Sequence, residues 1–231
     1  MKNSGGAGVE VTKVEQMTNL AEYPLFSGIR PQDIATMLSC LRARRQPFAK
    51  GAYLLLEGED VRCIGAVLSG QVHMLKEDLN GELTILAVIR ARGLFGESFV
   101  CGSRRATTVC FQAAADTETL LLPFDRVLHV CSNACIFHQR LLENMIRMIA
   151  DKNMQLMEKA EIVSKKTLRG KILAYLSMQA SEQGSRRIVS AINRAELADY
   201  LCANRSALSR ELSAMQDEGL IEFENNVFKL L

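Results

Sequence analysis

The sequence has no tryptophan, only three histidines and four prolines, and no apolar run long enough to cross a membrane as a helix. Its seven cysteines are odd in number and include no CxxC pair, which argues against a disulfide framework and for reduced thiols. The opening residues, MKNSGGAGVE, are polar and have none of the features of a signal peptide. We therefore expect a globular, cytoplasmic protein that does not use a membrane.

Charge is unevenly distributed along the chain, although the net charge is only +2. Residues 1–164 are balanced, with 18 basic and 18 acidic side chains, whereas residues 165–210 carry nine basic and three acidic ones. Residues 211–231 reverse the sign, with five acids and one lysine. Contacts to a phosphate backbone need such a concentration of positive charge, although a solvated basic face has the same composition.

Two short helical patterns around a tight break occupy residues 193–220, which read NRAELADYLCANRSALSRELSAMQDEGL. Asn193, followed three residues later by Glu196, predicts a capping box at the start of the first helix. Asn204 is the predicted cap of a second helix, whose apolar residues recur at i, i+4 and i+7 on one face. The opposite face is polar, as a helix in a major groove requires, although an ordinary helical hairpin has the same spacing. The candidate DNA-contacting residues are Arg194, Asn204, Arg205, Ser206, Ser209, Arg210 and Ser213.

A hairpin pattern follows the second helix. Glu218-Gly219 predicts the end of the helix, and Ile221–Phe223 and Val227–Leu230 alternate around the turn Asn225-Asn226. Two helices followed by a hairpin predict a winged helix and favour DNA binding.

Short alternating runs broken by glycines extend from about residue 42 to residue 123. The predicted strands are Ala52–Leu56, Ile64–Leu68, Gln71–Lys76, Leu83–Ile89, Thr107–Ala113 and Thr119–Leu122, with a hairpin at Asn80-Gly81. This spacing is typical of a small antiparallel barrel or jelly roll, whose interior is filled by side chains or holds one small ligand.

A long helix is predicted from Cys135 to about Val163, a segment without glycine or proline. Its apolar stripe is wider than one face of a barrel needs, so we expect part of it to meet a partner helix; burial against its own domain is the alternative. The candidate dimerisation residues are Leu141, Leu142, Met145, Met148, Ile149 and Leu156. A hinge is expected at residues 164–166, followed by a helix at Thr167–Ala180 and a strand at Arg187–Ala191.

Three motifs in this order resemble the bacterial Crp/Fnr (cyclic-AMP receptor/fumarate–nitrate regulator) family: the glycine-punctuated segment beginning FAKGAYLLLEGE, the cassette GLFGESF with RRATTV, and RSALSREL. The resemblance covers the chain from about residue 22. It implies an α+β protein with a cyclic-nucleotide-binding-type antiparallel β-roll (25–131) after a leader (1–24), a long dimerisation helix (132–163) and a C-terminal winged helix-turn-helix (164–231). It also implies a homodimeric transcription regulator of palindromic double-stranded DNA, with RNA polymerase as a partner.

The resemblance further assigns individual residues. Arg205 and Arg210 match positions that contact phosphate or guanine edges. Ser206 departs from the glutamate of many relatives, so their half-site does not carry over, and Cys202 replaces a glycine often found in the turn. The implied effector-binding residues are Gly96, Glu97, Ser98, Arg105, Ala106 and Thr107, to which we add Asn144 of the long helix.

The nature of the effector stays open. A cyclic nucleotide, another small anion or no ligand are alternatives, because Ser98-Phe99 replaces the small aliphatic residues usual after Gly-Glu. Redox or gas sensing is a further alternative, with Cys131, Cys135 and His138 spaced for a metal and His129 or His138 available to haem; simple packing is favoured for these side chains. An enzyme of the cupin type is disfavoured, since it would need two closely spaced barrel histidines.

Overall fold

The computed structural model describes residues 20–78, 80–81, 83–128 and 136–231. The chain packs as two units, Met1–Ile149 and Ala150–Leu231, which have separate hydrophobic cores. Among the described residues, no helix combines the length and the apolar character needed to cross a membrane.

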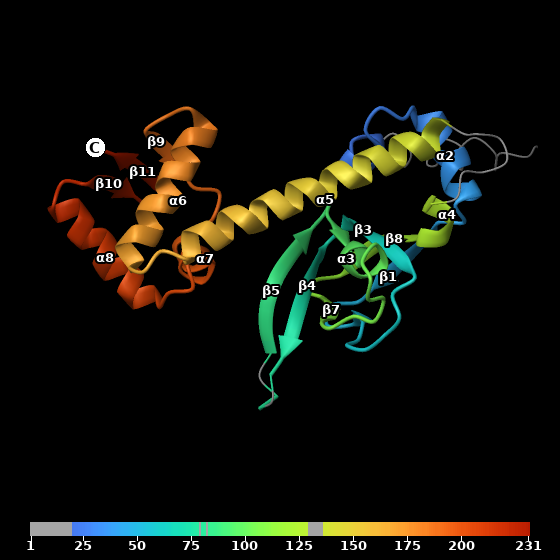
Figure 1. The fold of residues 1–231 in the computed structure, drawn as a ribbon, viewed down its shortest axis with the longest axis horizontal. Coiled ribbons are helices and arrows are strands. Elements are labelled where there is room, and N and C mark those ends of the chain that lie inside the picture. The colour runs from blue at the N-terminus through green and yellow to red at the C-terminus, as the bar shows by residue number, and fades with distance from the viewer. Residues whose placement is uncertain (1–19, 79, 82, 129–135) are drawn as a thin grey trace, which may run out of the picture. The chain divides into compact units, whose positions relative to one another are not determined.

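The N-terminal unit is built on two antiparallel four-stranded sheets (Figure 1). One sheet has the order β1 (Arg44–Phe48), β8 (Thr117–Pro123), β3 (Cys63–Ser69) and β6 (Leu94–Phe95). The other has the order β2 (Tyr53–Leu55), β7 (Cys110–Ala113), β4 (Gln71–Glu77) and β5 (Leu83–Arg90). Short helices accompany them: η1 (Pro24–Phe26), α2 (Pro31–Cys40), α3 (Glu97–Val100) and α4 (Phe124–Leu128). The predicted antiparallel β-roll is confirmed.

Two strands lie outside the predicted set, and one predicted strand begins three residues too early. β1 reads RRQPF and is exposed over its first four residues, because it is an edge strand; Pro47 is tolerated there. β6 has only two residues. The predicted strand Thr107–Ala113 begins at Cys110 instead, because the Thr107 hydroxyl donates to the carbonyl of Val109 at 2.6 Å and holds a local turn.

The predicted hairpin between β4 and β5 is confirmed, and the two strands lie side by side in Figure 1. Gly81 adopts a left-handed φ of 83°, and its N–H donates to the Asp78 carbonyl at 3.1 Å. The Asp78 carboxylate also accepts from the N–H of Asn80 at 2.8 Å. A side-chain acceptor and a glycine thus close this turn, as the sequence pattern requires.

Aromatic side chains fill part of the roll. The rings of Phe95 and Phe111 have centroids 5.7 Å apart, and Phe99 meets Phe111 edge-on at 6.3 Å. A Cβ at Gly65 on β3 would collide with the ring of Phe95, so the absence of a side chain there makes room for the ring. Phe95 and Phe111 belong to a buried cluster that also contains Val67. The interior of this roll is therefore packed with protein at Phe95, Phe99 and Phe111.

The long helix α5 (Ile136–Val163) confirms the predicted helix over the part of it that the structure describes. Leu141 and Met145 are 1% and 4% exposed and lie in the core of the N-terminal unit, so their assignment to a dimer surface is wrong: no exposed area is left for a partner. Leu142, Met148 and Ile149 pack against the same core but are only partly buried. Leu156 is 66% exposed.

The C-terminal unit contains α6 (Leu168–Gln183), β9 (Arg187–Val189), α7 (Arg194–Tyr200), α8 (Arg205–Asp217), β10 (Ile221–Glu224) and β11 (Val227–Leu230). The three strands form one antiparallel sheet in the order β10-β11-β9. The turn between β10 and β11 has Asn225 at a φ of 51°, a conformation that asparagine tolerates. The predicted winged helix is confirmed, including its two-residue hairpin turn.

The starts of α7 and α8 are held as predicted. The Asn193 carboxamide accepts from the N–H of Glu196 at 3.0 Å, and the Glu196 carboxylate accepts from the N–H of Asn193 at 2.8 Å, which completes the capping box. The Asn204 side-chain oxygen accepts from the N–H and the hydroxyl of Ser206 at 2.9 and 2.7 Å. These contacts fix where α7 and α8 begin.

The last turn of α5 packs with the winged helix. Ile162 is 2% exposed and lies in the core of the C-terminal unit. The Lys159 ammonium also lies 5.3 Å from the centroid of the Tyr200 ring on α7. By packing, the end of α5 therefore belongs to the C-terminal unit, and a hinge at residues 164–166 stays a prediction.

Candidate functional site

Helix α8 buries one face completely and exposes the other. Leu208, Leu212 and Met215 have no exposed surface. The polar face of α8, defined as Arg205, Ser206, Ser209, Arg210 and Ser213, is exposed at every one of these positions. Five of the seven predicted DNA-contacting residues therefore share one accessible helix face.

Arginines give this face its capacity to bind an anion or a base edge. Arg205 lies at the first position of α8, and its guanidinium is 3.8 Å from the Asp199 carboxylate, with both side chains about 70% exposed. Such an exposed ion pair contributes little to the free energy of unfolding, so Arg205 can readily exchange Asp199 for another anion. Arg210 lies five residues further along, on the same exposed face. An arginine fork there can donate to guanine O6 and N7.

The two remaining predicted contacts are already engaged inside the winged helix. Asn204 uses its side-chain oxygen to cap α8. Arg194 lies with its guanidinium 4.6 Å from the centroid of the Phe223 ring and donates to the carbonyl of Asn225 at 3.3 Å. Arg194 therefore ties the first helix of the motif to the hairpin.

The turn between α7 and α8 depends on two residues of different kinds. Cys202 adopts a φ of 52°, a left-handed conformation that glycine adopts most readily. Lys171 of α6 donates from its ammonium to the carbonyl of Leu201 at 3.1 Å. The contact of Lys171 is absent from the sequence-based prediction, because nothing in the local pattern links α6 to this turn.

A second unpredicted contact joins α6 to α8. Arg169 donates to the Glu211 carboxylate at 2.6 Å and to both oxygens of Glu218 at 2.7 and 2.8 Å. The hydrogen bonds to Glu218 and Glu211 raise the pKa of Arg169. A signal existed in the sequence: a cation in the first turn of α6 and an acid at the end of α8 both oppose the helix dipole.

In the N-terminal unit, the two halves of the predicted effector cassette border the same short segment. Gly96 caps α3 with a φ of 78°, and a Cβ there would lie 3.2 Å from both the Cys63 carbonyl and Val61 Cγ1. From the other half, the Arg105 carbonyl accepts from the N–H of Val61 at 3.0 Å. Ala106 forms an isolated bridge with Asp60. Residues 60–63 thus bring the two halves together.

The polar groups of the cassette differ in their availability. Glu97 is 4% exposed, whereas Ser98 and Ala106 are exposed. Arg105 has a side chain that is 52% exposed, and its guanidinium lies 3.9 Å from the Asp125 carboxylate. Its neighbour Arg104 is exposed as well, so this loop offers two guanidinium groups.

Two predicted effector contacts are engaged elsewhere. The Thr107 hydroxyl donates to the Val109 carbonyl at 2.6 Å and accepts from the Val109 N–H at 3.1 Å, and the side chain is 2% exposed. The Asn144 amide donates to the carbonyls of Leu25 and Ser27 at 3.1 and 2.8 Å. Both side chains therefore stabilise the fold of the N-terminal unit.

Of the cysteine and histidine residues considered as metal or haem ligands, the structure describes only His138. His138 is 1% exposed, and neither ring nitrogen has a hydrogen-bond partner within the described part of the chain. Burial lowers the pKa of His138 and so favours the neutral ring. Cys131, Cys135 and His129 lie outside the described residues, and the described ones contain no cluster of ligands suited to a metal ion.

Two family models match the chain. Residues 45–134 match a cyclic nucleotide-binding domain, and residues 170–231 match a Crp-like helix-turn-helix domain. The first match covers the roll from β1 onward, and the second begins within α6 and includes the hairpin.

Two relatives are similar to this chain over most of its length. A cyclic AMP receptor protein of Thermus thermophilus is 27% identical over 200 residues, which cover 86% of this chain and 88% of the relative. The transcriptional activator protein anr of Pseudomonas aeruginosa is 25% identical over 193 residues, covering 81% and 77%.

Solved structures share the fold at lower identity. CprK complexed with OCPA superposes with a TM-score of 0.62 at 16% identity, covering 86% of this chain and 88% of that one. A CooA mutant from Carboxydothermus hydrogenoformans has a TM-score of 0.57 at 20% identity, covering 83% and 85%. With an N-terminal nucleotide-binding-type roll and a C-terminal winged helix in the family's order, the chain belongs to the Crp/Fnr family of DNA-binding transcription regulators.

Proposed function

We propose that the protein is a homodimeric, sequence-specific transcription regulator whose α8 enters the major groove of a palindromic site. The observation that supports this most directly is the polar face of α8, exposed along its length and backed by a completely buried apolar face. A helix with this division presents its polar side chains outward, where they can reach base edges in a major groove. Two copies would place their α8 helices in half-sites about 34 Å apart.

Individual roles follow from chemistry. Arg210 would donate to a guanine edge, and Arg205, at the N-terminus of α8, would bind phosphate once its weak pairing with Asp199 opens. Ser206 carries one hydroxyl that already donates to Asn204, so it offers no bidentate acceptor to a cytosine. The preferred half-site should therefore differ from that of relatives with glutamate at this position.

The exposed apolar side chains of α5 support a dimer through this helix. Met154, Leu156 and Met157 are 58%, 66% and 64% exposed, and Ile146 is 62% exposed. Large apolar residues at this density on one helix are costly in water and are typical of a helix that meets a partner. These four exposed residues differ from the predicted dimerisation residues, of which only Leu156 is large, apolar and exposed.

The effector would be a small anion held at the loop of Arg104 and Arg105. Both guanidinium groups are accessible, while the Thr107 hydroxyl and the Asn144 amide are engaged within the fold. Phe99 also occupies space beside Phe111. An effector that binds the DNA-competent state more tightly would shift the population by its differential affinity alone.

The remaining elements of the proposal follow from the family. As a transcription regulator and not an enzyme, the protein would act in the cytoplasm and would contact RNA polymerase when bound near a promoter. The relatives described above carry names of receptor and activator proteins, which supports this class of function.

We predict that Arg210→Ala lowers the affinity for a specific duplex at least about tenfold, because one bidentate base contact is lost. Fluorescence anisotropy with a labelled duplex selected by the wild-type protein measures this. Arg126→Ala, which removes an exposed arginine of α4, is the control and should bind like the wild type. Unchanged binding by Arg210→Ala would show that α8 does not read bases through this residue.

We predict that Leu156→Glu shifts the protein from dimer to monomer, because two carboxylates would be placed in an apolar interface. Sedimentation velocity at micromolar concentration gives the mass. Gln155→Glu adds the same charge at the neighbouring exposed position, about 100° around the helix, and should remain a dimer. A dimeric Leu156→Glu would place the interface elsewhere.

We predict that Arg104→Gln combined with Arg105→Gln abolishes stabilisation by the effector, because both anion-binding groups of the loop are lost. Thermal unfolding with cyclic AMP, cyclic di-GMP and inorganic phosphate as separate probes tests this, since a ligand of the folded state raises the melting temperature. At least one probe should stabilise the wild type and Arg126→Gln but not the double variant. Equal stabilisation of the double variant, or none of the wild type by any probe, would contradict this site.

A further inference from the structure

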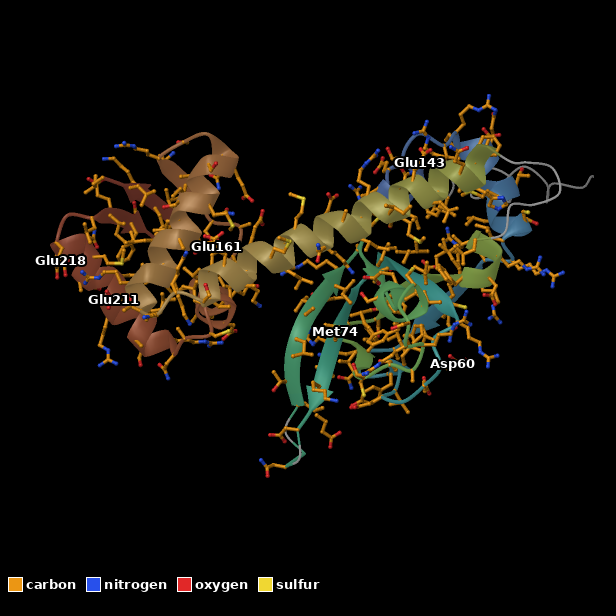
Figure 2. The ribbon with its side chains drawn as sticks, in the orientation of Figure 1. Asp60, Met74, Glu143, Glu161, Glu211 and Glu218 are labelled. Carbon is orange, nitrogen blue, oxygen red and sulfur yellow. The ribbon has the colours of Figure 1, made fainter. Side chains whose placement is uncertain are left out.

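Arg169 connects the first turn of α6 to two points on α8 that are two turns apart. Its Nε donates to Glu211 at 2.6 Å, while Nη1 and Nη2 donate to the two carboxylate oxygens of Glu218 at 2.7 and 2.8 Å. Figure 2 labels both acids on α8. All three nitrogens of one guanidinium thus donate between α6 and α8, and the bonded residues are more than forty positions apart in sequence.

The stability of the separate helices does not explain why these charges stand where they do. Arg169 lies in the first turn of α6, where the helix dipole disfavours a cation, and Glu218 is the C-cap of α8, where the dipole disfavours an anion. Each charge therefore interacts unfavourably with the dipole of its own helix. The ion pair between Arg169 and Glu218 offsets both unfavourable interactions.

The contribution of the contact to global stability should be small. The side chains of Arg169, Glu211 and Glu218 are 37%, 27% and 49% exposed, and partly exposed ion pairs contribute little to the free energy of unfolding. The core of the same unit already buries Leu208, Leu212 and Met215 without any exposed surface. The contact therefore needs a role other than holding α8 to the fold.

Geometry suggests that role. Glu211 and Glu218 are seven residues apart and so lie on one side of α8, flanking both the buried face and the polar face. Burial of the apolar face decides which side of α8 points outward, but the hydrophobic effect itself has no direction and does not set the last degrees of rotation about the helix axis. A planar guanidinium bound to two carboxylates does fix direction.

We infer that Arg169 is a positioning residue for DNA recognition, which sets the rotation of α8 so that its polar face meets the base edges in register. Arg169 itself contacts no base in this account. The inference rests on the proposed role of α8. Recognition of base edges needs side chains held to within about 0.5 Å and 10–20°, which a directional contact supplies better than apolar packing.

A purely electrostatic role makes the opposite prediction for one variant. If Arg169 served only to neutralise two acids near the DNA, then Glu211→Gln combined with Glu218→Gln would bind DNA at least as well as the wild type, since the repulsion of phosphate is gone. If Arg169 positions α8, the same double variant loses specificity. Arg169→Lys adds an independent test, because it keeps the charge and loses the planar fork.

The experiment measures the affinity of the full chain for a duplex selected by the wild-type protein and for the same duplex with its half-sites scrambled. We expect Arg169→Lys and the double glutamine variant each to lower the ratio of the two affinities about tenfold, within the range of one base contact. Affinity for the scrambled duplex should not fall, and the melting temperature should stay within a few degrees of the wild type.

An unchanged ratio in both variants would overturn the inference, and so would a large fall in melting temperature, which would mean that the contact stabilises the fold. Arg210→Ala, measured in parallel, distinguishes failure of the positioning role of Arg169 from failure of the recognition role of α8. If Arg210→Ala loses specific binding while the Arg169 and glutamine variants do not, only the positioning role fails. If Arg210→Ala binds normally, the assignment of α8 as the recognition helix fails first.

Discussion

The burial of one face of α8 is the constraint on which the proposed function depends. Leu208, Leu212 and Met215 are completely buried in a core that also takes Ile162 from the last turn of α5 and Phe228 from the hairpin. Because these side chains must leave water together, the opposite face of α8 has to be presented to solvent. The exposure of the polar face of α8 is thus a consequence of packing.

The N-terminal unit has the fold of the family, but its side chains determine which ligand it can bind. Its two sheets form the roll of the family, and Gly96 keeps the backbone close to residues 61 and 63. Yet Phe99 packs edge-on against Phe111, and the Thr107 hydroxyl donates its hydrogen bond to the carbonyl of Val109 in a local turn. The architecture therefore establishes an effector-type domain, while the chemistry of the effector depends on a few side chains around the cassette.

Local signals made much of the fold predictable. The capping box at Asn193, the cap at Asn204 and the turn at Asn225 involve residues at most three apart, so their geometry follows directly from sequence spacing. The contacts of Arg169 and Lys171 with α8 and its preceding turn join distant segments. Charges that oppose their helix dipoles mark Arg169 and Glu218 as unusual, but no local pattern pairs them, and none indicates the contact of Lys171. The same holds for α5: its apolar stripe was visible, but only the packing shows that Leu141 and Met145 belong to the chain's own core.

In the proposed complex, two copies of α8 read a palindrome, and Ser206 lies on the reading face of each. Selection of bound duplexes from a random library, performed with the wild-type protein and with Ser206→Glu, tests it most directly. The account predicts an inverted repeat with half-sites about 10 base pairs apart, centre to centre, for both proteins. It also predicts that the variant changes the preferred base at one symmetric position and keeps the spacing. Selected sequences without an inverted repeat, or identical preferences for the two proteins, would contradict it.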